Sequence, residues 1–171
     1  KDFNNNDIMT SDGSGNVTVN ASGLQNTPAF EAYLSANQTL SDDTITKLQI
    51  NTEIYDTDSK YDNSTNYRFT PASSGKYFVY GATKATVDTA SQLRDVILYI
   101  YKNGSAYKRA EFRFANNDAQ RTNPYIGAGI DFNTTDYVEL FLYINNAASG
   151  VVQANADDKA TYFGAYKLIG A

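Results

Sequence analysis

The sequence predicts an all-β fold, a two-sheet jelly-roll sandwich, on three observations. From Pro28 onward, short runs rich in Val, Ile, Thr, Tyr and Phe alternate with turn residues, as in antiparallel sheets. No stretch of helical length repeats its apolar residues with a period of about 3.6. About nine such runs follow one another at regular spacing, which favours two packed sheets over a single one.

The burial of several expected strands can be inferred from their pattern. The run RAEFRFA (109–115) alternates apolar and charged residues, so one of its faces should be solvated. The runs DVILYIY (95–101) and YVELFLYIN (137–145) are apolar on both faces and should be central. In chain order the expected strands cover residues 29–35, 45–55, 67–70, 76–86, 93–102, 106–115, 125–133, 136–145 and 160–169.

Two turns can be predicted in more detail. Pro71 and Gly75 should bend the chain between the strand at 67–70 and the strand that starts at Lys76. The pair Asn103-Gly104 joins two strands, and a one-residue change in loop length would invert every side chain after it. A three-residue loop puts the apolar residues of both strands on one face. We therefore expect a type I turn closed by a bulge, with Gly104 left-handed.

The aromatic content of the chain is high, with 14 Tyr and 9 Phe but no Trp. In KYFVYGA (76–82) and TYFGAYKLI (161–169), both strand faces carry aromatic or aliphatic side chains. One face can line the core, and the other needs a cover that a monomer does not provide. We therefore expect a subunit interface there. The alternative is that these Tyr side chains stand on a solvated sheet, where they have high β-propensity.

The first 27 residues differ in composition from the remainder of the chain. They are rich in Asn, Gly, Ser and Thr, with one short apolar pair at Val17 and Val19. We expect residues 1–27 to be a linker or stem segment and residues 28–171 to be the jelly-roll domain. A disordered tail is the alternative for the first segment. The chain starts with Lys1, which indicates a processed protein or a piece of a longer one.

Composition also argues against several classes of function. The chain has neither His nor Cys, which removes disulfides, thiolate zinc sites, a Cys nucleophile and the commonest general base. Its net charge of −5, without clustered Lys and Arg, is unfavourable for nucleic-acid binding. No apolar run approaches the roughly 20 residues that span a bilayer. We expect a protein that is not an enzyme, needs no cofactor and does not insert into a membrane.

Five segments in order carry a resemblance to a known family. They are PAFEAYLSANQTL (28–40), YDNSTNYRFTPASSGKYFVYGA (61–82), LYIYKNGSAYKRA (98–110), DFNTTDYVELFLYI (131–144) and ATYFGAYKLIG (160–170). Together they resemble the globular head domain of the complement first subcomponent q family, within the tumour necrosis factor superfamily. The match covers about residues 28–170.

The resemblance implies a ten-stranded jelly roll that assembles as a compact homotrimer. In that family the first, third and last strands face the three-fold axis. Carried over by position, it implies trimer-interface or near-interface roles for a set of five residues, although the pattern does not tell which of each alternating pair points inward. The set consists of Phe30, Tyr77, Val79, Phe163 and Tyr166.

The family also forms heads on bacteriophage virions, and the Asn-, Thr- and Tyr-rich composition resembles that branch. We therefore expect a non-enzymatic domain of a tail fibre or head fibre, at the virion surface or otherwise extracellular. It would mediate adhesion or receptor binding, with a host-surface glycan or protein, or other virion proteins, as partners. The alternatives are a purely structural capsid decoration or fibre knob, and a secreted bacterial carbohydrate-binding or adhesin module.

Loops with exposed Tyr and Asp side chains are the expected places for a ligand. Tyr can stack on sugars or anchor a protein partner. The ligand-loop candidates are Tyr55, Asp56, Asp58, Tyr61 and Tyr125. The acidic run DTDSKYD (56–62) has some calcium-loop character, but Lys60 stands where a further oxygen ligand belongs, so turn-forming Asp residues are favoured and no metal is expected.

Overall fold

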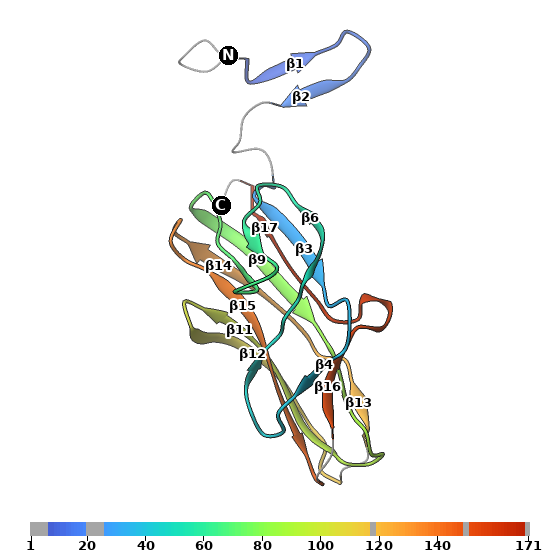
Figure 1. The fold of residues 1–171 in the computed structure, drawn as a ribbon. Helices are drawn as coiled ribbons and strands as arrows, with labels where there is room; N and C mark the ends of the chain where they lie inside the picture. Colours follow the sequence, from blue (N-terminus) through green and yellow to red (C-terminus); the bar gives the residue numbers. More distant parts are fainter. Residues whose placement is uncertain (1–6, 20–25, 117–118, 149–150, 170–171) are drawn as a thin grey trace.

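Antiparallel strands supply nearly all of the regular secondary structure in the computed structural model, which describes residues 7–19, 26–116, 119–148 and 151–169 (Figure 1). Within these residues the only helical element is the 3-10 turn η2 (Asp157–Lys159). The all-β prediction is therefore confirmed. None of the described elements is a helix long and apolar enough to cross a membrane.

The first sheet of the sandwich has the strand order β14-β9-β17-β3-β6, and every neighbouring pair is antiparallel. Figure 1 shows these strands running side by side through the upper part of the jelly roll. Their bounds are β3 (Ala29–Tyr33), β6 (Thr52–Asp56), β9 (Gly75–Ala82), β14 (Tyr125–Phe132) and β17 (Tyr162–Lys167).

The second sheet has the order β12-β11-β15-β8-β7, and β5 also pairs with β15. Its long central strands are the two that the sequence marks as apolar on both faces. The bounds are β5 (Thr46–Lys47), β7 (Tyr61–Asp62), β8 (Arg68–Phe69), β11 (Leu93–Lys102), β12 (Ser105–Arg113) and β15 (Val138–Asn146).

A small third sheet, which the sequence did not predict, extends the sandwich at one end. Its order is β13-β10-β16-β4, formed by β4 (Gln38–Leu40), β10 (Lys84–Val87), β13 (Arg121–Thr122) and β16 (Val152–Asn155). Strand β10 continues β9 after Thr83, and β16 precedes β17. The hydroxyls of Thr83 and Thr161 lie 3.1 Å apart where the sheets diverge, and both residues are fully buried. The Thr161 hydroxyl also donates to the Asn155 carbonyl at 2.6 Å, so this buried polar pair is satisfied.

The core lies between the first and second sheets and is dominated by aromatic rings. Phe30 is fully buried and stacks on Tyr61 and Phe69, with ring centroids 4.5 and 4.7 Å apart. Phe163 meets the Phe30 ring edge-on at 5.2 Å. The Tyr61 hydroxyl donates to the Ile50 carbonyl at 2.8 Å, which satisfies the polar end of a buried ring.

The Asn103-Gly104 hairpin has the predicted facing but not the predicted loop. Val96, Leu98 and Ile100 pair with Phe112, Ala110 and Lys108, so the apolar residues share a face as expected. Gly104 is left-handed (φ 76°), but so is Asn103 (φ 51°), and Lys102 pairs with Ser105 across a two-residue loop. The register is corrected by a bulge between Ile100 and Tyr101, so the prediction of a three-residue loop is wrong.

The predicted corner between the second and first sheets is present. Strand β8 ends at Phe69 and β9 begins at Gly75, whose φ of 136° suits glycine. The Tyr77 hydroxyl donates to the Ser73 carbonyl at 2.7 Å, which fixes the loop after Pro71 to the start of β9.

In the first 27 residues, the described part contains one hairpin. Strands β1 (Met9–Ser11) and β2 (Val17–Val19) pair with each other, and neither belongs to the sheets of the jelly roll. The Asp12 carboxylate accepts from the backbone N–H of Ser14 at 2.8 Å and the side-chain amide of Asn16 at 2.7 Å, which holds the turn.

Candidate functional site

The outer face of the first sheet carries a cluster of four aromatic rings. Along β9 the side chains alternate, so that Tyr77 and Val79 are buried in the core while the residues between them point outward. The outward rings lie in contact with centroid distances of 5.7 to 6.3 Å. We call this surface the aromatic face and define it by Phe78, Tyr80, Tyr162 and Tyr166.

Two glycines allow the rings of Tyr80 and Phe78 to approach the backbone of neighbouring strands closely. A Cβ at Gly164 would overlap the Tyr80 ring, and a Cβ at Gly127 would stand 2.8 Å from the Phe78 ring. Gly164 and Gly127 pair with Tyr80 from opposite sides of β9. Glycine at these positions therefore serves close packing, since a strand glycine often marks the near approach of another group.

A single carboxylate lies in this otherwise uncharged cluster. The Tyr80 hydroxyl reaches across Gly164 and donates to Glu31 Oε2 at 2.6 Å. Burial of the phenol, together with this bond to a carboxylate and the nearby Tyr55, raises the pKa of Tyr80 well above its usual range. Tyr80 is therefore a neutral donor at any physiological pH.

A shallow hollow of about 440 Å³ lies beside the Tyr80–Glu31 pair. The Lys159 ammonium stands 4.9 Å over the Tyr33 ring at its border. Lys159 and the preceding Asp158 both have positive φ, 57° and 50°, which is uncommon for residues other than glycine. The residues that line the hollow are Glu31, Ile54, Tyr80, Tyr125, Lys159 and Tyr162.

A second unusual surface lies at the β12 edge of the other sheet. Val96, Leu98 and Ile100 are fully buried, so their partners on β12 also point to the core side. The first sheet ends at β14, however, and Phe112 remains 42% exposed. Tyr107 is 50% exposed, with its hydroxyl 3.4 Å from the Gly129 carbonyl of β14. We call this surface the edge patch and define it by Tyr107, Lys108 and Phe112.

The structure corrects the assignment of predicted interface residues. The side chains of four of them are fully buried in the core of this single chain, so the prediction that they lie at a subunit interface is wrong: Phe30, Tyr77, Val79 and Phe163. Tyr166 points outward and belongs to the aromatic face. Sequence reasoning missed Phe78, Tyr80 and Tyr162, which occupy the alternate positions of the same strands.

The predicted ligand-loop residues do not converge on one site. Tyr55 and Tyr125 are exposed, and Tyr125 lies at the hollow. The Asp56 carboxylate accepts from the backbone N–H of Tyr61 at 2.7 Å and of Asp58 at 3.3 Å, so it closes its own turn. Tyr61 is buried in the core and only borders the pocket at the Pro71 corner, so its role as a ligand contact stays a prediction.

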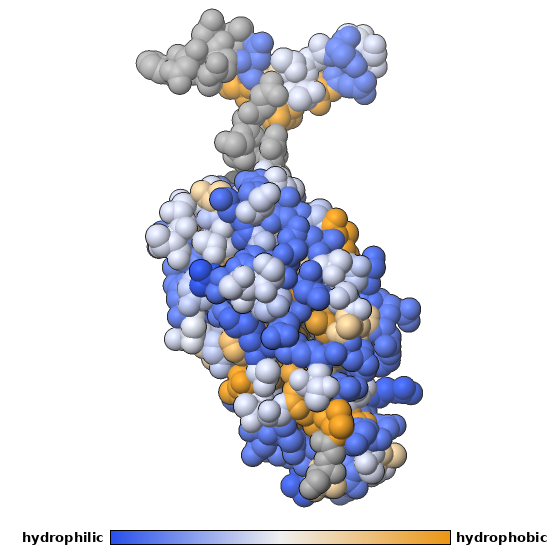
Figure 2. Space-filling view, in the orientation of Figure 1, coloured by the Kyte–Doolittle hydropathy of each residue, from blue (hydrophilic) through white to orange (hydrophobic). Residues whose placement is uncertain are grey.

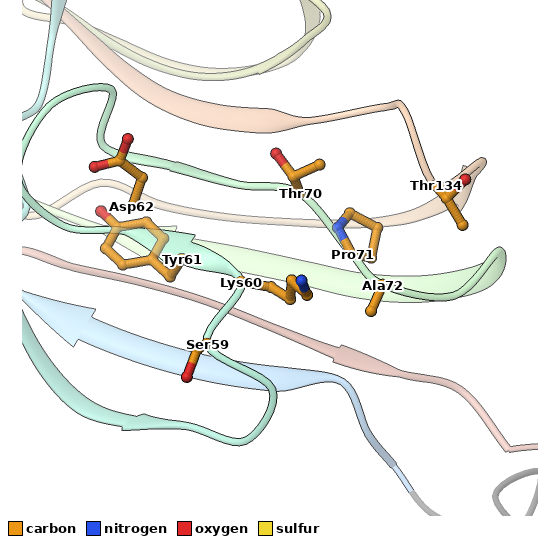
Figure 3. A pocket seen from close by; sticks show the side chains of 8 residues that line it. All are labelled: Ser59, Lys60, Tyr61, Asp62, Thr70, Pro71, Ala72 and Thr134. Atoms are coloured by element: carbon orange, nitrogen blue, oxygen red, sulfur yellow. The ribbon is translucent and has the colours of Figure 1, made fainter.

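An open pocket of about 410 Å³ lies at the Pro71 corner (Figure 3). Its one carboxylate, Asp62, accepts from the backbone N–H of Thr65 at 2.8 Å and the side-chain amide of Asn66 at 2.6 Å. These bonds hold the pKa of Asp62 well below its usual range. The carboxylate is thus used by its own loop, which supports the interpretation of this stretch as a structural corner.

The acidic side chains give no indication of a metal centre. Across the described ranges, no three acidic side chains converge into a group that could hold an ion. The adjacent acids of the 41–46 turn are used structurally. Asp42 accepts from the Asn146 backbone N–H at 2.8 Å, and Asp43 accepts from the Tyr143 hydroxyl and from the Asn145 amide.

Hydropathy over one side of the molecule is mixed. Figure 2 shows hydrophobic residues in small patches between hydrophilic ones on the jelly roll, and a further patch on the N-terminal hairpin. The candidate contact surfaces on this molecule are therefore defined by specific side chains and not by one large apolar area.

Three solved structures with similar folds identify the class of this domain. Eiger TNF from S. frugiperda is 11% identical with a TM-score of 0.59, over 84% of this chain and 93% of that one. The globular domain of the zebrafish complement 1qA protein is 12% identical with a TM-score of 0.57, over 83% and 98%. Murine APRIL, solved at pH 5.0, is 11% identical with a TM-score of 0.59, over 82% and 98%. The chain therefore has the jelly-roll fold of tumour necrosis factor and complement q domains.

A relative in sequence adds a narrower comparison. YqcC of Bacillus subtilis strain 168, itself an uncharacterised protein, is 29% identical over 129 residues. The match covers 72% of this chain and 34% of YqcC, so the chain spans about a third of the length of that relative. No protein-family model matches the chain.

Proposed function

We propose that this chain is a non-enzymatic binding module that works as a homotrimer. The observation that carries the proposal is the aromatic face, where four rings, two of them packed over glycines, cover the outer side of a sheet whose inner side already faces the core. Aromatic side chains bury large areas when they are covered, and they are enriched in protein interfaces.

The second apolar surface indicates how the copies would meet. The edge patch lies on β12 of the second sheet, whereas the aromatic face lies on the first sheet, so the two surfaces are distinct. A contact between two distinct surfaces is heterologous, and such contacts form a closed ring when the rotation between copies closes. The edge patch of one copy would then cover the aromatic face of the next, and the shared fold supports three copies in the ring.

A trimer of this kind leaves the solvated side of the second sheet and several loops free for a ligand. Exposed Asp58 lies in the turn that follows β6 and remains a candidate for contact with a glycan or a protein. Tyr55 pairs with Glu31 across β3 and β6, so it lies on the side of the first sheet that the next copy would cover. Three copies on one particle would also strengthen weak individual contacts through avidity. The module therefore suits adhesion to a repetitive surface.

We place the module at the surface of a phage virion, as a head or tail fibre, or otherwise outside the cell. The support is that the ordered motifs resemble the complement q-like family and that the Asn-, Thr- and Tyr-rich composition resembles its virion branch. Mass spectrometry of purified particles of the phage whose genes lie beside this one tests the placement. Absence of the protein from the particles, with its presence in the culture medium, would favour the secreted bacterial alternative.

Sedimentation velocity on matched variants tests the assembly. Tyr166→Arg puts a charge into the aromatic face and should convert the trimer to monomer at micromolar concentration. Ile45→Arg is the matched control, because Ile45 is 43% exposed and lies outside both surfaces. Equal sedimentation of the two variants would contradict the assignment of the face.

A further inference from the structure

Glu31 lies beside the aromatic face, which the proposed trimer would bury, and its carboxylate has no positively charged partner among the described residues. Its carboxylate accepts one hydrogen bond, from the neutral Tyr80 hydroxyl at 2.6 Å. Within the described ranges, no cation lies at ion-pair distance from it. A carboxylate that is removed from water without an opposite charge is strongly unfavourable, because a phenol alone does not replace its hydration. Covering the aromatic face therefore favours a contact that brings a positive charge to Glu31.

The edge patch offers such a charge. Lys108 pairs with the buried Ile100 and therefore points to the core side of β12, together with Phe112 and close to Tyr107. It is exposed and makes no ion pair among the residues that the structure describes. The next residue, Arg109, lies on the opposite face of the strand, where it stands 3.6 Å from Glu111. Lys108 is thus the cation that the edge patch would carry into a contact.

We propose that Lys108 of one copy pairs with Glu31 of the next, so that the hollow beside Tyr80 is a binding site completed by a second copy of this chain. This inference rests on the proposed homotrimer and specifies its contact. The rings of Tyr80, Tyr125 and Tyr162 line the hollow together with Glu31. A Lys side chain can enter it with its stem along the rings and its ammonium at the carboxylate. Charge complementarity would fix the register of the ring.

One other cation must be distinguished from Lys108. Lys159 of the same copy borders the hollow, held over the Tyr33 ring by the turn after β16. If Lys159 turned toward Glu31 on assembly, no cation from the partner would be needed. The two possibilities can be distinguished by reversing charges. When Glu31 is changed to Lys, trimer stability should be restored by an acidic residue at position 108 in the first case and at position 159 in the second.

A charge-swap experiment separates them. Glu31→Lys should raise the dissociation constant of the trimer by at least about 30-fold. Adding Lys108→Glu should restore most of that loss, whereas adding Lys159→Glu should not. Rescue by Lys159→Glu alone, or by neither change, would overturn the pairing. Far-ultraviolet circular dichroism and thermal melts establish whether each variant folds. If Glu31→Lys does not fold, Glu31→Gln serves as a milder variant.

Cross-linking gives a second readout, which does not depend on charge. The natural chain has no Cys, so Glu31→Cys with Lys108→Cys creates the only two thiols. Oxidation at low protein concentration should give a covalent trimer on a non-reducing gel, and each single variant should not. A wild-type chain that sediments as a monomer would refute the proposed trimer itself. A wild-type trimer without charge rescue or cross-linking would refute only this pairing.

Discussion

The Tyr80 ring lies directly over Gly164, and its hydroxyl donates to Glu31 at 2.6 Å on the next strand. This relationship joins three neighbouring strands of the first sheet through one side chain. It is possible only because Gly164 has no Cβ, and it leaves an aromatic surface with one carboxylate on it. The aromatic face therefore depends on a glycine that does nothing for the core.

Gly164→Ala should lift the Tyr80 ring off the sheet. The added methyl group overlaps the ring, and overpacking of this kind costs about 1–3 kcal/mol in the free energy of unfolding. Self-association should weaken as well, because the Tyr80 ring is displaced from its place in the aromatic face. Urea unfolding and sedimentation velocity measure the two effects. Gly129→Ala on β14 of the same sheet is the matched control, since nothing lies within 4 Å of its Cβ position. Equal losses in both variants would refute this explanation.

Phe30→Ala and Tyr166→Ala should separate the two sides of the first sheet. Phe30 is fully buried among three aromatic rings, so its truncation should cost about 3–5 kcal/mol in the unfolding of the chain itself. Tyr166→Ala should leave the folded chain nearly as stable and mainly reduce association. Urea denaturation at protein concentrations below and above those at which the chain associates distinguishes a loss of chain stability from a loss of association. A loss of association without a loss of stability in Phe30→Ala would reverse the assignment of faces.

The sequence predicted the class of fold, the Pro71 corner and the shared face of the hairpin strands, because each follows from a local pattern. It did not predict the orientation of KYFVY, because both alternating sets there are apolar: Tyr77 and Val79 on one side, Phe78 and Tyr80 on the other. Alternation identifies the buried face only when the other face is polar.

A signal for the aromatic face was nevertheless present in the sequence. Gly127 and Gly164 interrupt strands that otherwise carry large side chains, and glycine within a strand marks close approach. The sequence signal for the third sheet is weaker, because β4 and β16 are short and about half of their residues are polar. Their pairing depends on neighbours distant in the chain, which a local pattern does not reveal.

Lys47→Met should destabilise the second sheet. Lys47 Nζ lies 2.5 Å from Glu139, whose side chain is 6% exposed, and also donates to the Asn66 carbonyl at 3.1 Å. Removing the cation leaves a buried carboxylate unpaired, which costs about 3 kcal/mol for a pair whose Lys is partly solvated. The double variant Lys47→Met with Glu139→Gln should recover much of this loss in urea unfolding. Equal stability of the single and double variants would contradict the explanation that the loss comes from the unpaired Glu139 carboxylate.

Asp136 should contribute stability that is lost in acid. The backbone N–H of Asn133, the Asn103 amide and the Lys102 ammonium lower the pKa of Asp136 from 3.8 to about 2. The fold therefore favours the ionised form, so this stability is present above about pH 4 and is lost as the pH falls toward 2. The difference in urea midpoint between wild type and Asp136→Asn should shrink over that interval. A difference that stays constant from pH 5 to pH 2 would contradict the linkage.

The mass of the wild-type particle in solution tests the central proposal most directly. Light scattering coupled to size exclusion, at micromolar concentration and neutral pH, should give three times the chain mass of 18.8 kDa. A single species of 18.8 kDa that persists as concentration is raised would contradict the homotrimer and the roles given to the aromatic face and the edge patch.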